Sequence, residues 1–392
     1  MRVYFDYNAT TPLTPEVLDV LASTSREVFG NASSVHHFGQ RAKAVLDEAR
    51  TSVAALIGAH PPELILTCSG TEADNLAIRG VAEAAAAGNR RHLVTSTIEH
   101  EAVLNTLKAL ARQGWTTTLL PVDSAGIVSL DAARGAITTD TALVSIMHAN
   151  NEIGTVQPVA AIAAIAHEKG ALMHSDAVQS VGKIPVHVGS LGVDLLSMSA
   201  HKFSGPKGAG ALWVRRGTRL VPILTGGKHE RSRRAGTENV PAVAGMGVAA
   251  RAAMAKMSTE AVRVGALRDR LERTILDRVS GTAVNGHTAQ RVPNTTNISF
   301  DHVEAESLLI ALDLEGVAVS TGSACSSGTL EPSHVLRAMG FPAHRTQNSL
   351  RFSLGLFSTD AEVDRVLTVL PGLVDKLRRL SRSPRANPVG TA

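Results

Sequence analysis

The chain has 392 residues, of which 44% are hydrophobic and 19% charged, a composition that excludes disorder for most of its length. A prior of about 150 residues per domain predicts two or three domains. The formal charge of +4 and the 3% of aromatic residues disfavour a nucleic-acid-binding protein. We interpret the two basic runs, Lys228–Arg234 and Lys376–Arg385, as solvated surface or tail.

Neither a membrane span nor an export signal is indicated. No apolar run approaches the roughly 18 residues that a membrane helix needs. Asp6 lies where a signal peptide would need apolar residues, so we expect a cytoplasmic protein. Its two cysteines, Cys68 and Cys325, are then expected to be reduced, and they are too few for a four-cysteine metal site.

Short apolar runs rich in β-branched residues alternate with alanine-rich helical stretches up to Pro241. The expected strands are Leu64–Thr67, His92–Thr97, Thr116–Val122, Ala142–Met147, Ala171–Ser175, Val193–Met198, Gly210–Val214 and Val221–Leu224. The expected helices are Glu72–Ala87, His100–Gln113 and Val159–Lys169. This alternation predicts an α/β fold, and the continuous apolar runs indicate a mostly parallel sheet that helices cover on both faces.

After Pro241 the pattern changes to that of a smaller α/β domain. The expected elements are a helix over Val248–Val279, a strand Asn297–Phe300, a helix Glu304–Glu315, strands Val317–Ser320 and Ser349–Leu354, and a helix from about Thr359. Pro371 should kink or restart this last helix. We expect a large domain over 13–250 and a small one formed by 1–12 and 251–392, because the strand-like Val3–Asp6 precedes the first helix.

Polar and ionisable groups follow the expected strands, where ligands bind in open α/β sheets. They are Cys68–Glu72, Ile98–His100, His148–Glu152, Asp176 with Gln179, and Ser199–Lys202. Any single group of this kind is more often a cap or a turn residue. Their repetition at one edge of a sheet indicates a site.

The turn Cys68–Glu72 has two interpretations. Small residues that lead into a helix N-terminus, with hydroxyl and free N–H groups, suit a phosphate. A serine or threonine followed by glutamate is also an ordinary capping box. The turn alone leaves both open.

Lys202 lies between a strand and a Gly/Pro turn. A lysine in a packed crevice is a candidate for Schiff-base chemistry, because desolvation and nearby positive charge favour its neutral, nucleophilic form. Pyridoxal phosphate needs such a lysine and also a carboxylate on its ring nitrogen, for which Asp176 is suited. His100 can supply a flat ring over the cofactor. Taken alone, Lys202 could equally be a surface lysine on a turn.

With these residues in place, the chain resembles cysteine desulfurases of the NifS/IscS type, within the class V, fold type I pyridoxal-phosphate enzymes. The matching motifs are Asp6–Pro12, Gly30–His36, Ser69–Asn75, Glu99–His100, Asn150–Gly154, Asp176–Ser180, Ser199–Lys202, Gly236–Thr237, Gly322–Cys325 and Leu350–Ser353. They extend over nearly the whole chain apart from the tail. The resemblance implies a homodimer whose large domain has a mostly parallel, seven-stranded-type sheet, beside a smaller α/β domain.

The resemblance also implies a role for each matching residue. Lys202 would form the Schiff base and move protons, Asp176 would pair with the ring nitrogen, and Gln179 would reach the ring hydroxyl. His100 would stack on the ring and take part in acid–base steps. The phosphate would be held by Gly70, Thr71, Ser199 and His201, and Thr237 would reach the phosphate of the partner subunit. Asn151, which we also expect at the cofactor, and Arg351 would position the substrate carboxylate, a role that the planar guanidinium fork suits.

Cys325 decides which reaction is expected. It lies among small residues bounded by glycines, a composition typical of a mobile loop rather than of an inert core thiol. The implied reaction converts L-cysteine to L-alanine and leaves sulfur on Cys325 as a persulfide, for transfer to an acceptor in iron–sulfur or thiolation pathways. A selenocysteine lyase, another class V transaminase, and a binding protein on an inactive enzyme fold are the alternatives.

Two features depart from the resembling family. Cys68 precedes the expected phosphate turn, where the family more often has a residue without a thiol. We interpret Cys68 as a packing residue, with an accessory redox group as the alternative. The basic tail lacks the acidic, aromatic ending that some members use with scaffold proteins, so the sulfur acceptor stays open.

Overall fold

The computed structural model of the chain describes residues 2–86, 88, 90–321 and 332–382. Its first part builds a seven-stranded sheet in the order β2-β8-β7-β6-β5-β3-β4. The strands are β2 (Leu64–Thr67), β3 (His92–Ser96), β4 (Thr116–Leu120), β5 (Thr141–Ser145), β6 (Leu172–Asp176), β7 (Leu195–Ser199) and β8 (Gly210–Val214). The prediction of an α/β fold with a mostly parallel sheet is therefore confirmed.

The direction of β8 decides where the strand ends meet. β8 is antiparallel to both of its neighbours, β2 and β7, whereas the other neighbouring pairs are parallel. It follows that all strands except β8 point the same way, so that their carboxyl ends lie at one edge. We call the carboxyl ends of β2, β3, β5, β6 and β7 the rim.

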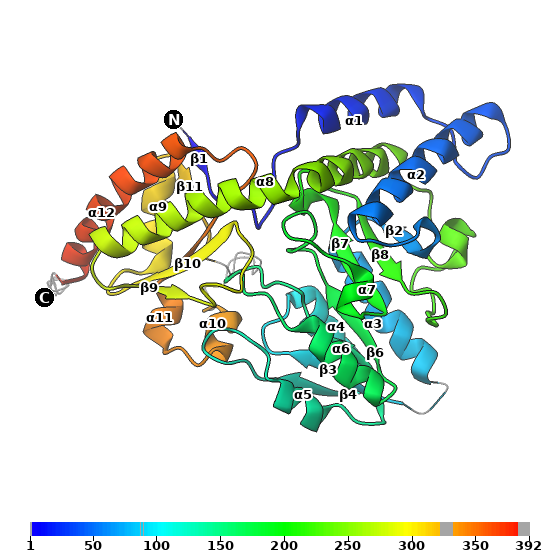
Figure 1. Ribbon diagram of the computed structural model, residues 1–392, viewed down its shortest axis with the longest axis horizontal. Helices are drawn as coiled ribbons and strands as arrows, with labels where there is room; N and C mark the ends of the chain where they lie inside the picture. The colour runs from blue at the N-terminus through cyan, green and yellow to red at the C-terminus, as the bar shows by residue number, and fades with distance from the viewer. Residues whose placement is uncertain (1, 87, 89, 322–331, 383–392) are drawn as a thin grey trace, which may run out of the picture.

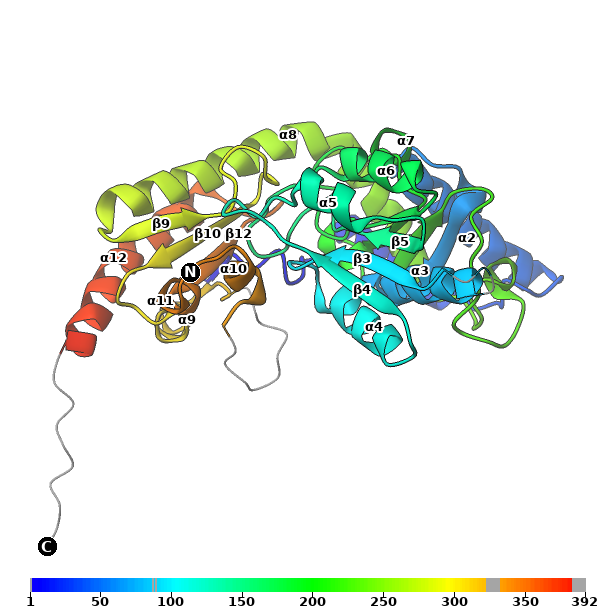
Figure 2. The same cartoon turned by 90° about the horizontal axis from the view of Figure 1, so that it is seen from below.

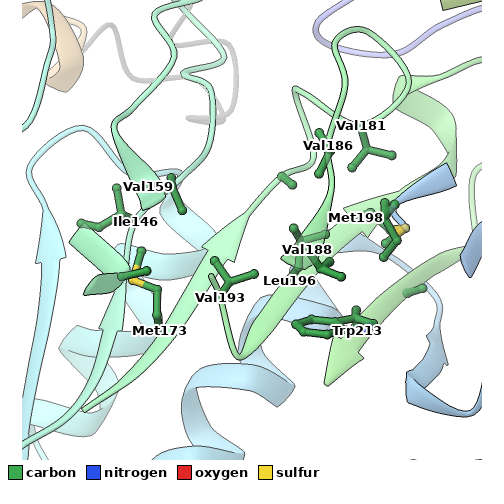
Figure 3. Close-up of a cluster of buried hydrophobic side chains, with 14 of the residues drawn as sticks. Ile146, Val159, Met173, Val181, Val186, Val188, Val193, Leu196, Met198 and Trp213 are labelled. Carbon is green, nitrogen blue, oxygen red and sulfur yellow. The ribbon is translucent and has the colours of Figure 1, made fainter. Parts of the chain in front are cut away.

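Helices cover the large sheet on both faces (Figures 1 and 2). The helices of this part of the chain are α1 (Pro15–Glu27), which lies against α8 (Val240–Arg278), and α2 (His37–Leu56), α3 (Gly70–Ala86), α4 (Glu101–Ala111), α5 (Leu130–Ala136), α6 (Val159–Glu168) and α7 (Val188–Leu191). One face packs against α2, α6 and α8 in the core that Figure 3 shows in part. The other face packs against α3 and α4. Burial on both faces explains the continuous apolar runs of these strands.

The C-terminal part has its own core. An antiparallel sheet has the order β12-β10-β9, and β1 pairs in parallel with β11. The strands are β1 (Val3–Tyr4), β9 (Thr282–Asn285), β10 (Thr295–Phe300), β11 (Val317–Ala318) and β12 (Ser349–Ser353); the helices are α9 (Ala305–Leu314), α10 (His334–Ala338), α11 (Ala343–Gln347) and α12 (Asp360–Arg382). Val3 and Phe5 belong to this core. We propose domains of 13–250 and of 1–12 with 251–392, which α8 would connect (Figure 1).

Two predictions about elements are wrong, and a third holds at most in part. Residues Val221–Leu224 form no strand; Ile223 and the preceding Leu220 instead pack against the core that α3 and α4 share with the sheet. α8 begins at Val240 rather than Val248, because Asn239 caps it and a proline is tolerated in the first turn. α12 runs through Pro371, so of the two outcomes expected at this proline the restart does not occur. In the described part of the chain, no helix is long and apolar enough to cross a membrane.

Candidate active site at the rim of the large sheet

The rim brings the predicted catalytic side chains together. Asp176 is the last residue of β6, Lys202 ends the 3₁₀ turn Ala200–Lys202 after β7, and His100 caps α4 after β3. The charges of His100 and Lys202 both lower the pKa of Asp176. An effect of this kind requires proximity, so the three groups share one site.

Asp176 is a buried carboxyl group for which the described part of the chain shows no salt bridge to an arginine. It is 6% exposed, and its Oδ1 accepts a hydrogen bond of 2.9 Å from the N–H of Val178. Burial raises its pKa, against the lowering by His100 and Lys202. A cation placed against it, such as a protonated ring nitrogen, would keep the carboxylate ionised.

His100 presents a neutral ring at the site. Its Nδ1 accepts a hydrogen bond of 3.1 Å from the N–H of Ala102, which caps α4 and leaves the proton on Nε2. Burial lowers its pKa; the charge of Asp176 opposes this lowering, and the charge of Lys202 adds to it. A neutral imidazole can stack on a flat ligand and exchange a proton at Nε2.

The N-terminal segment holds Lys202 in place. Its Nζ donates to the carbonyl oxygens of Asn8 at 2.5 Å and Ala9 at 2.7 Å. The neighbouring His201 has its Nδ1 3.1 Å from Thr10 Oγ1, and burial lowers its pKa to about 4, so it acts as a neutral hydrogen-bonding group. The motif Asp6–Pro12 therefore contributes to the site through its backbone and hydroxyl groups.

A cavity of about 470 Å³ opens beside Lys202. Its lining includes Lys183, Lys202, Phe203 and residues of α8, but not Asp176, His100 or Ser199. The cavity therefore lies next to the rim and is separate from the space that those three side chains face.

The turn after β2 caps helix α3 and also lies close to the ends of β6 and β7. Ser69 Oγ accepts a hydrogen bond of 3.1 Å from the N–H of Glu72, and Glu72 Oε2 accepts one of 2.7 Å from the N–H of Cys68, which confirms the capping interpretation. At Gly70 a Cβ atom would lie 2.7 Å from Val178 Cγ2 and 3.4 Å from Ser199 Cβ. The turn thus lies against the ends of β6 and β7, and a side chain at Gly70 would fill this space.

Ser199 has a hydroxyl group available for a ligand. Its Oγ is buried and has no hydrogen-bond partner among the residues that the structure describes. A buried, unpaired hydroxyl is uncommon and carries a free-energy cost that a ligand oxygen would remove. Ser199, Gly70 and the exposed Thr71 together give a place suited to an anion.

Arg351 reaches the rim from β12. It is 3% exposed, and it donates to Asp6 Oδ1 at 2.6 Å and to the carbonyl oxygen of Asn151 at 3.0 Å. Its Nε has no partner within the described ranges, so the guanidinium retains donors for a further acceptor. The structure therefore brings together Arg351 and Asn151, the two residues predicted to position a carboxylate.

The remaining predicted residues lie in different settings. Gln179 is buried, and its Nε2 donates to the carbonyl oxygen of Asn8 at 2.9 Å. Thr237 is exposed on the segment Gly226–Glu238. Three residues before it, Arg234 pairs with Glu72 in the first turn of α3, with Nε and Oε1 2.7 Å apart. Exposure of Thr237 in a single chain leaves it accessible to a second copy.

The interpretation of Lys228–Arg234 as solvated surface is wrong for part of this run. Glu230 is buried; its Oε1 lies 2.6 Å from Arg50 Nη2, and its Oε2 accepts a hydrogen bond from the N–H of Leu66 in the edge strand β2. Glu230, Arg231 and Ser232 all have positive φ angles, at 45°, 57° and 64°. Successive non-glycine residues of this kind cost free energy, and the buried ion pair stabilises the turn.

Cys325 lies outside the described residues, but the chain on either side of it is attached at the site. Ser320 and Arg351 exchange backbone hydrogen bonds of 2.7 and 3.2 Å. On the other side, Ser333 Oγ donates to Glu152 Oε2 at 2.5 Å, and His334 Nε2 lies 2.9 Å from the carbonyl oxygen of Glu99. The described residues Ser320, Ser333 and His334, which flank the stretch that contains Cys325, are thus held at the rim.

The packing interpretation of Cys68 is wrong, because this residue is exposed. Its pKa is raised, first by the limited solvation of the sulfur and next by a hydrogen bond with Glu72. A raised pKa keeps the thiol protonated and poorly nucleophilic.

Sequence reasoning missed a layer of buried ionisable residues beneath the rim. Burial raises the pKa of Glu99 to about 8 and that of Asp74 well above its usual value, and it lowers the pKa of His174 to about 3. Glu99 receives hydrogen bonds from Ser96 and Met147, and His174 lies between the hydroxyl groups of Ser145 and Ser197. Glu99 and Asp74 lie within the quoted motifs Glu99–His100 and Ser69–Asn75 but were given no role, and the only sequence signal for His174 is its place two residues before Asp176.

Asn8 was also missed, although it lies within a quoted motif. Besides its contacts with Lys202 and Gln179, its amide nitrogen donates to the carbonyl oxygen of Asn151 at 3.0 Å and to Thr295 Oγ1 at 2.8 Å. It is 1% exposed. Asn8 therefore links the catalytic lysine to the C-terminal part of the chain.

Comparison with known proteins places this site in a family. The family model described as Aminotransferase class-V matches residues 3–366. The chain belongs to the class V aminotransferase family. It is 49% identical over 380 residues to "Cysteine desulfurase IscS" of Dictyoglomus turgidum, covering 97% of this chain and 96% of that one. It is 48% identical over 379 residues to "Cysteine desulfurase" of a Nostoc species, covering 97% of this chain and 94% of the relative.

The solved structures agree with the family assignment. One titled "NIFS-LIKE PROTEIN" superposes with a TM-score of 0.88 at 37% identity, covering 97% of this chain and 99% of that chain. The predicted resemblance is therefore confirmed, and with it the fold type I architecture.

Class V aminotransferases use pyridoxal phosphate, and the residues at the rim fit this cofactor. The buried hydroxyl of Ser199 is unpaired, and the space beside Gly70 has no side chain in it. Asp176 is a buried carboxyl that accepts a hydrogen bond from the N–H of Val178 and is suited to pair with a protonated ring nitrogen. Lys202 lies in the turn that follows β7, the parallel neighbour of β6, so it lies at the same edge of the sheet as Asp176.

Proposed function

We propose that this chain is a cysteine desulfurase that converts L-cysteine to L-alanine and keeps the sulfur as a persulfide on Cys325. The observation that carries the proposal is the convergence of Lys202, Asp176 and His100 at the rim, with Arg351 reaching them from β12. Relatives named cysteine desulfurase at 48–49% identity over 97% of the chain support the substrate.

The chain's own residues would hold the cofactor by its different parts. Gly70, Thr71, Ser199 and His201 would take the phosphate, Asp176 the ring nitrogen and Gln179 the ring oxygen. His100 would cover the ring, with Asn151 beside it. When bound, pyridoxal phosphate supplies an electron sink for the electron pair left by removal of the α-proton.

Lys202, His100 and Arg351 would then do the work of orientation and proton transfer. Arg351 still has unpaired donors for the substrate carboxylate, and Asp6 keeps its guanidinium in one orientation. The amine of Lys202 would take up and return the α-proton, and the neutral ring of His100 would exchange a proton at Nε2.

In the sulfur step, the Cys325 thiolate attacks the sulfur of the substrate. The bond between this sulfur and the β-carbon breaks, its electron pair goes to the β-carbon, and that carbon takes up a proton to become the methyl group of alanine. Cys325 keeps the sulfur as a persulfide, which a second protein would accept. A thiolate is needed for the attack, so positive groups near the substrate favour it.

We further propose a homodimer located in the cytoplasm. In it, the exposed Thr237 would reach the cofactor phosphate of the other copy. Ion pairs of Glu230 with Arg50 and of Arg234 with Glu72 hold the segment Gly226–Glu238 against the large domain, which favours such a role.

Product analysis tests this function. The wild type, supplied with pyridoxal phosphate and L-cysteine, should release alanine and acquire one extra sulfur on Cys325. Cys325→Ser should still bind the cofactor yet release almost no alanine, because it lacks the attacking sulfur. Cys68→Ala is the matched control and should act like the wild type. Undiminished alanine release by Cys325→Ser, or sulfur found on Cys68, would refute the proposal.

A further inference from the structure

Lys183 is a lysine at the site for which the mechanism above has no role. It follows the turn after β6, is partly buried, and lines the same cavity as Lys202. Its Nζ donates to Gln179 Oε1 at 2.7 Å and to Asn8 Oδ1 at 2.9 Å. A lysine held by two side-chain amides next to the cofactor site needs an explanation.

These contacts fix which end of each amide faces which way. Gln179 Nε2 lies 2.9 Å from the carbonyl oxygen of Asn8, which only accepts, so the other end of this amide must be oxygen. That oxygen faces Lys183. The amide nitrogen of Asn8 likewise donates to the carbonyl oxygen of Asn151, which turns its oxygen toward Lys183 as well.

The arrangement needs two N–H donors on Lys183. Its amine supplies two whether or not it carries its third proton. Burial lowers its pKa well below the usual value, and the charges of Lys202 and Arg351 lower it further, but the orientation of the amides is the same in both protonation states. Asn294 Nδ2 adds a third donor to the same oxygen of Asn8, at 3.0 Å.

With its oxygen held by Lys183, Gln179 has one N–H left. A free N–H can donate to an ionised ring oxygen but cannot accept from a protonated one. We propose that Lys183 is a positioning residue that, together with the Asn8 carbonyl oxygen, holds Gln179 as a hydrogen-bond donor toward the ring oxygen of the cofactor. This rests on the proposed function, in which Gln179 takes that oxygen.

The proposal concerns the proton that the ring oxygen shares with the nitrogen of the bound lysine. A donor on the oxygen makes this proton easier to lose. The charged and titratable groups that face this place are Lys202, His201, Asp176, His100, Arg351 and Lys183 itself. A substitution at Lys183 leaves the other five unchanged, so a shift can be assigned to it.

The test is a pH titration of the visible absorbance of the protein loaded with pyridoxal phosphate. In Lys183→Met only the Asn8 carbonyl oxygen still orients the amide of Gln179, so its hydrogen bond to the ring oxygen is less firmly held and the pH at which the visible band is lost should rise by up to about one unit, as expected for one hydrogen bond. Lys183→Arg keeps the donors and should titrate like the wild type. Lys207→Met, an exposed lysine nearby, is the control and should not shift.

A double substitution separates positioning from structure. Gln179→Leu alone should raise the midpoint, and adding Lys183→Met should raise it no further. If Lys183→Met shifts the titration midpoint equally with and without the Gln179 side chain, the proposal is overturned. It is also overturned if Lys183→Met lowers the melting temperature but leaves the midpoint unchanged. If Lys183→Met takes up no cofactor, the titration midpoints of Lys183→Arg and Gln179→Glu test the proposal instead. Only the midpoint of Gln179→Glu should shift, and an equal shift in both variants contradicts the proposal. A wild-type protein that releases no alanine from L-cysteine would instead refute the proposed function.

Discussion

Buried ionisable groups behave differently in two regions of this molecule. Beneath the rim, burial favours the protonated forms of Glu99 and Asp74 and the neutral form of His174, although His174 Nε2 lies 3.6 Å from Asp74 Oδ1. At the edge strand β2, the side chains of Arg50 and Glu230 are 9% and 3% exposed and form a close ion pair. A buried charge persists only where a second charge meets it.

Asp176 lies between these two cases. It is nearly as buried as Glu99, Asp74 and His174, which we call the neutral layer, but the charges of His100 and Lys202 lower its pKa. A protonated ring nitrogen placed against Asp176 would add a positive charge in direct contact with its carboxylate. This is the physical reason why the rim is a cofactor site and the β2 edge is a structural joint.

Removing the carboxyl of Asp176 should give the largest effect. We expect Asp176→Asn to retain bound cofactor but to lose alanine release by about 10³-fold, because the ring nitrogen loses the charge that keeps it protonated. Steady-state alanine assays measure this loss. Activity within tenfold of the wild type would mean that Asp176 is one more member of the neutral layer.

Breaking the ion pair at the β2 edge should be the largest change in stability. Glu230→Ala leaves Arg50 buried and unpaired and the N–H of Leu66 without its acceptor, so we expect a loss of about 3–5 kcal/mol in the free energy of unfolding. Glu27→Ala breaks the exposed pair with Arg41 and should cost less than about 1 kcal/mol. Denaturant titration compares them, and equal costs would remove the distinction between the two regions.

Three histidines that burial keeps neutral predict that the protein is sensitive to acid. The pKa of His174 is about 3 and those of His148 and His201 about 4, against about 6.5 in the unfolded chain. Between pH 6.5 and 4 the unfolded chain binds protons that the folded chain does not, so stability falls as the pH falls, by about 1.4 kcal/mol per pH unit for each histidine. His174→Gln should reduce this slope in unfolding measurements, whereas His344→Gln, on an exposed residue, should not.

Glu99 predicts a slope of opposite sign. Its pKa of about 8 exceeds the unfolded value of about 4.5, so between these limits the folded chain binds the extra proton and stability falls as the pH rises. Glu99→Gln imitates the protonated form; it should stay within about 1 kcal/mol of the wild type at neutral pH and lose this slope. A variant that is strongly destabilised at pH 7 would show that the wild-type group is ionised there.

The sequence predicted most of the rim, because strand ends and the residues after them are local features. Asp176, Ser199 and Lys202 follow apolar runs and could be found from those runs alone. The sequence could not predict Asn8 as the partner of Lys202 and Gln179, since 194 and 171 residues separate them in the chain and only the fold brings them together. Lys183 was hidden for the same reason, as its role depends on Asn8.

Glu230 shows a second limit of sequence reasoning. It lies in a basic run that is typical of solvated surface, and its burial depends on Arg50 from a helix far earlier in the chain. The extra strand expected at Val221–Leu224 failed because apolar character in a short run does not distinguish a strand from a loop that packs on a helix. The predicted start of α8 at Val248 was too late, because Asn239 caps the helix and a proline is tolerated in its first turn, so that it begins at Val240.

The central claim is that the rim is built around Lys202 as the residue that binds the cofactor covalently. Borohydride reduction of the loaded protein, followed by proteolysis and mass spectrometry, tests it most directly, because it fixes the pyridoxyl group on the residue that carries it. We expect the added mass on the peptide that contains Lys202 and on no other. Its appearance on Lys183 or Lys207, or no incorporation at all, would contradict the account.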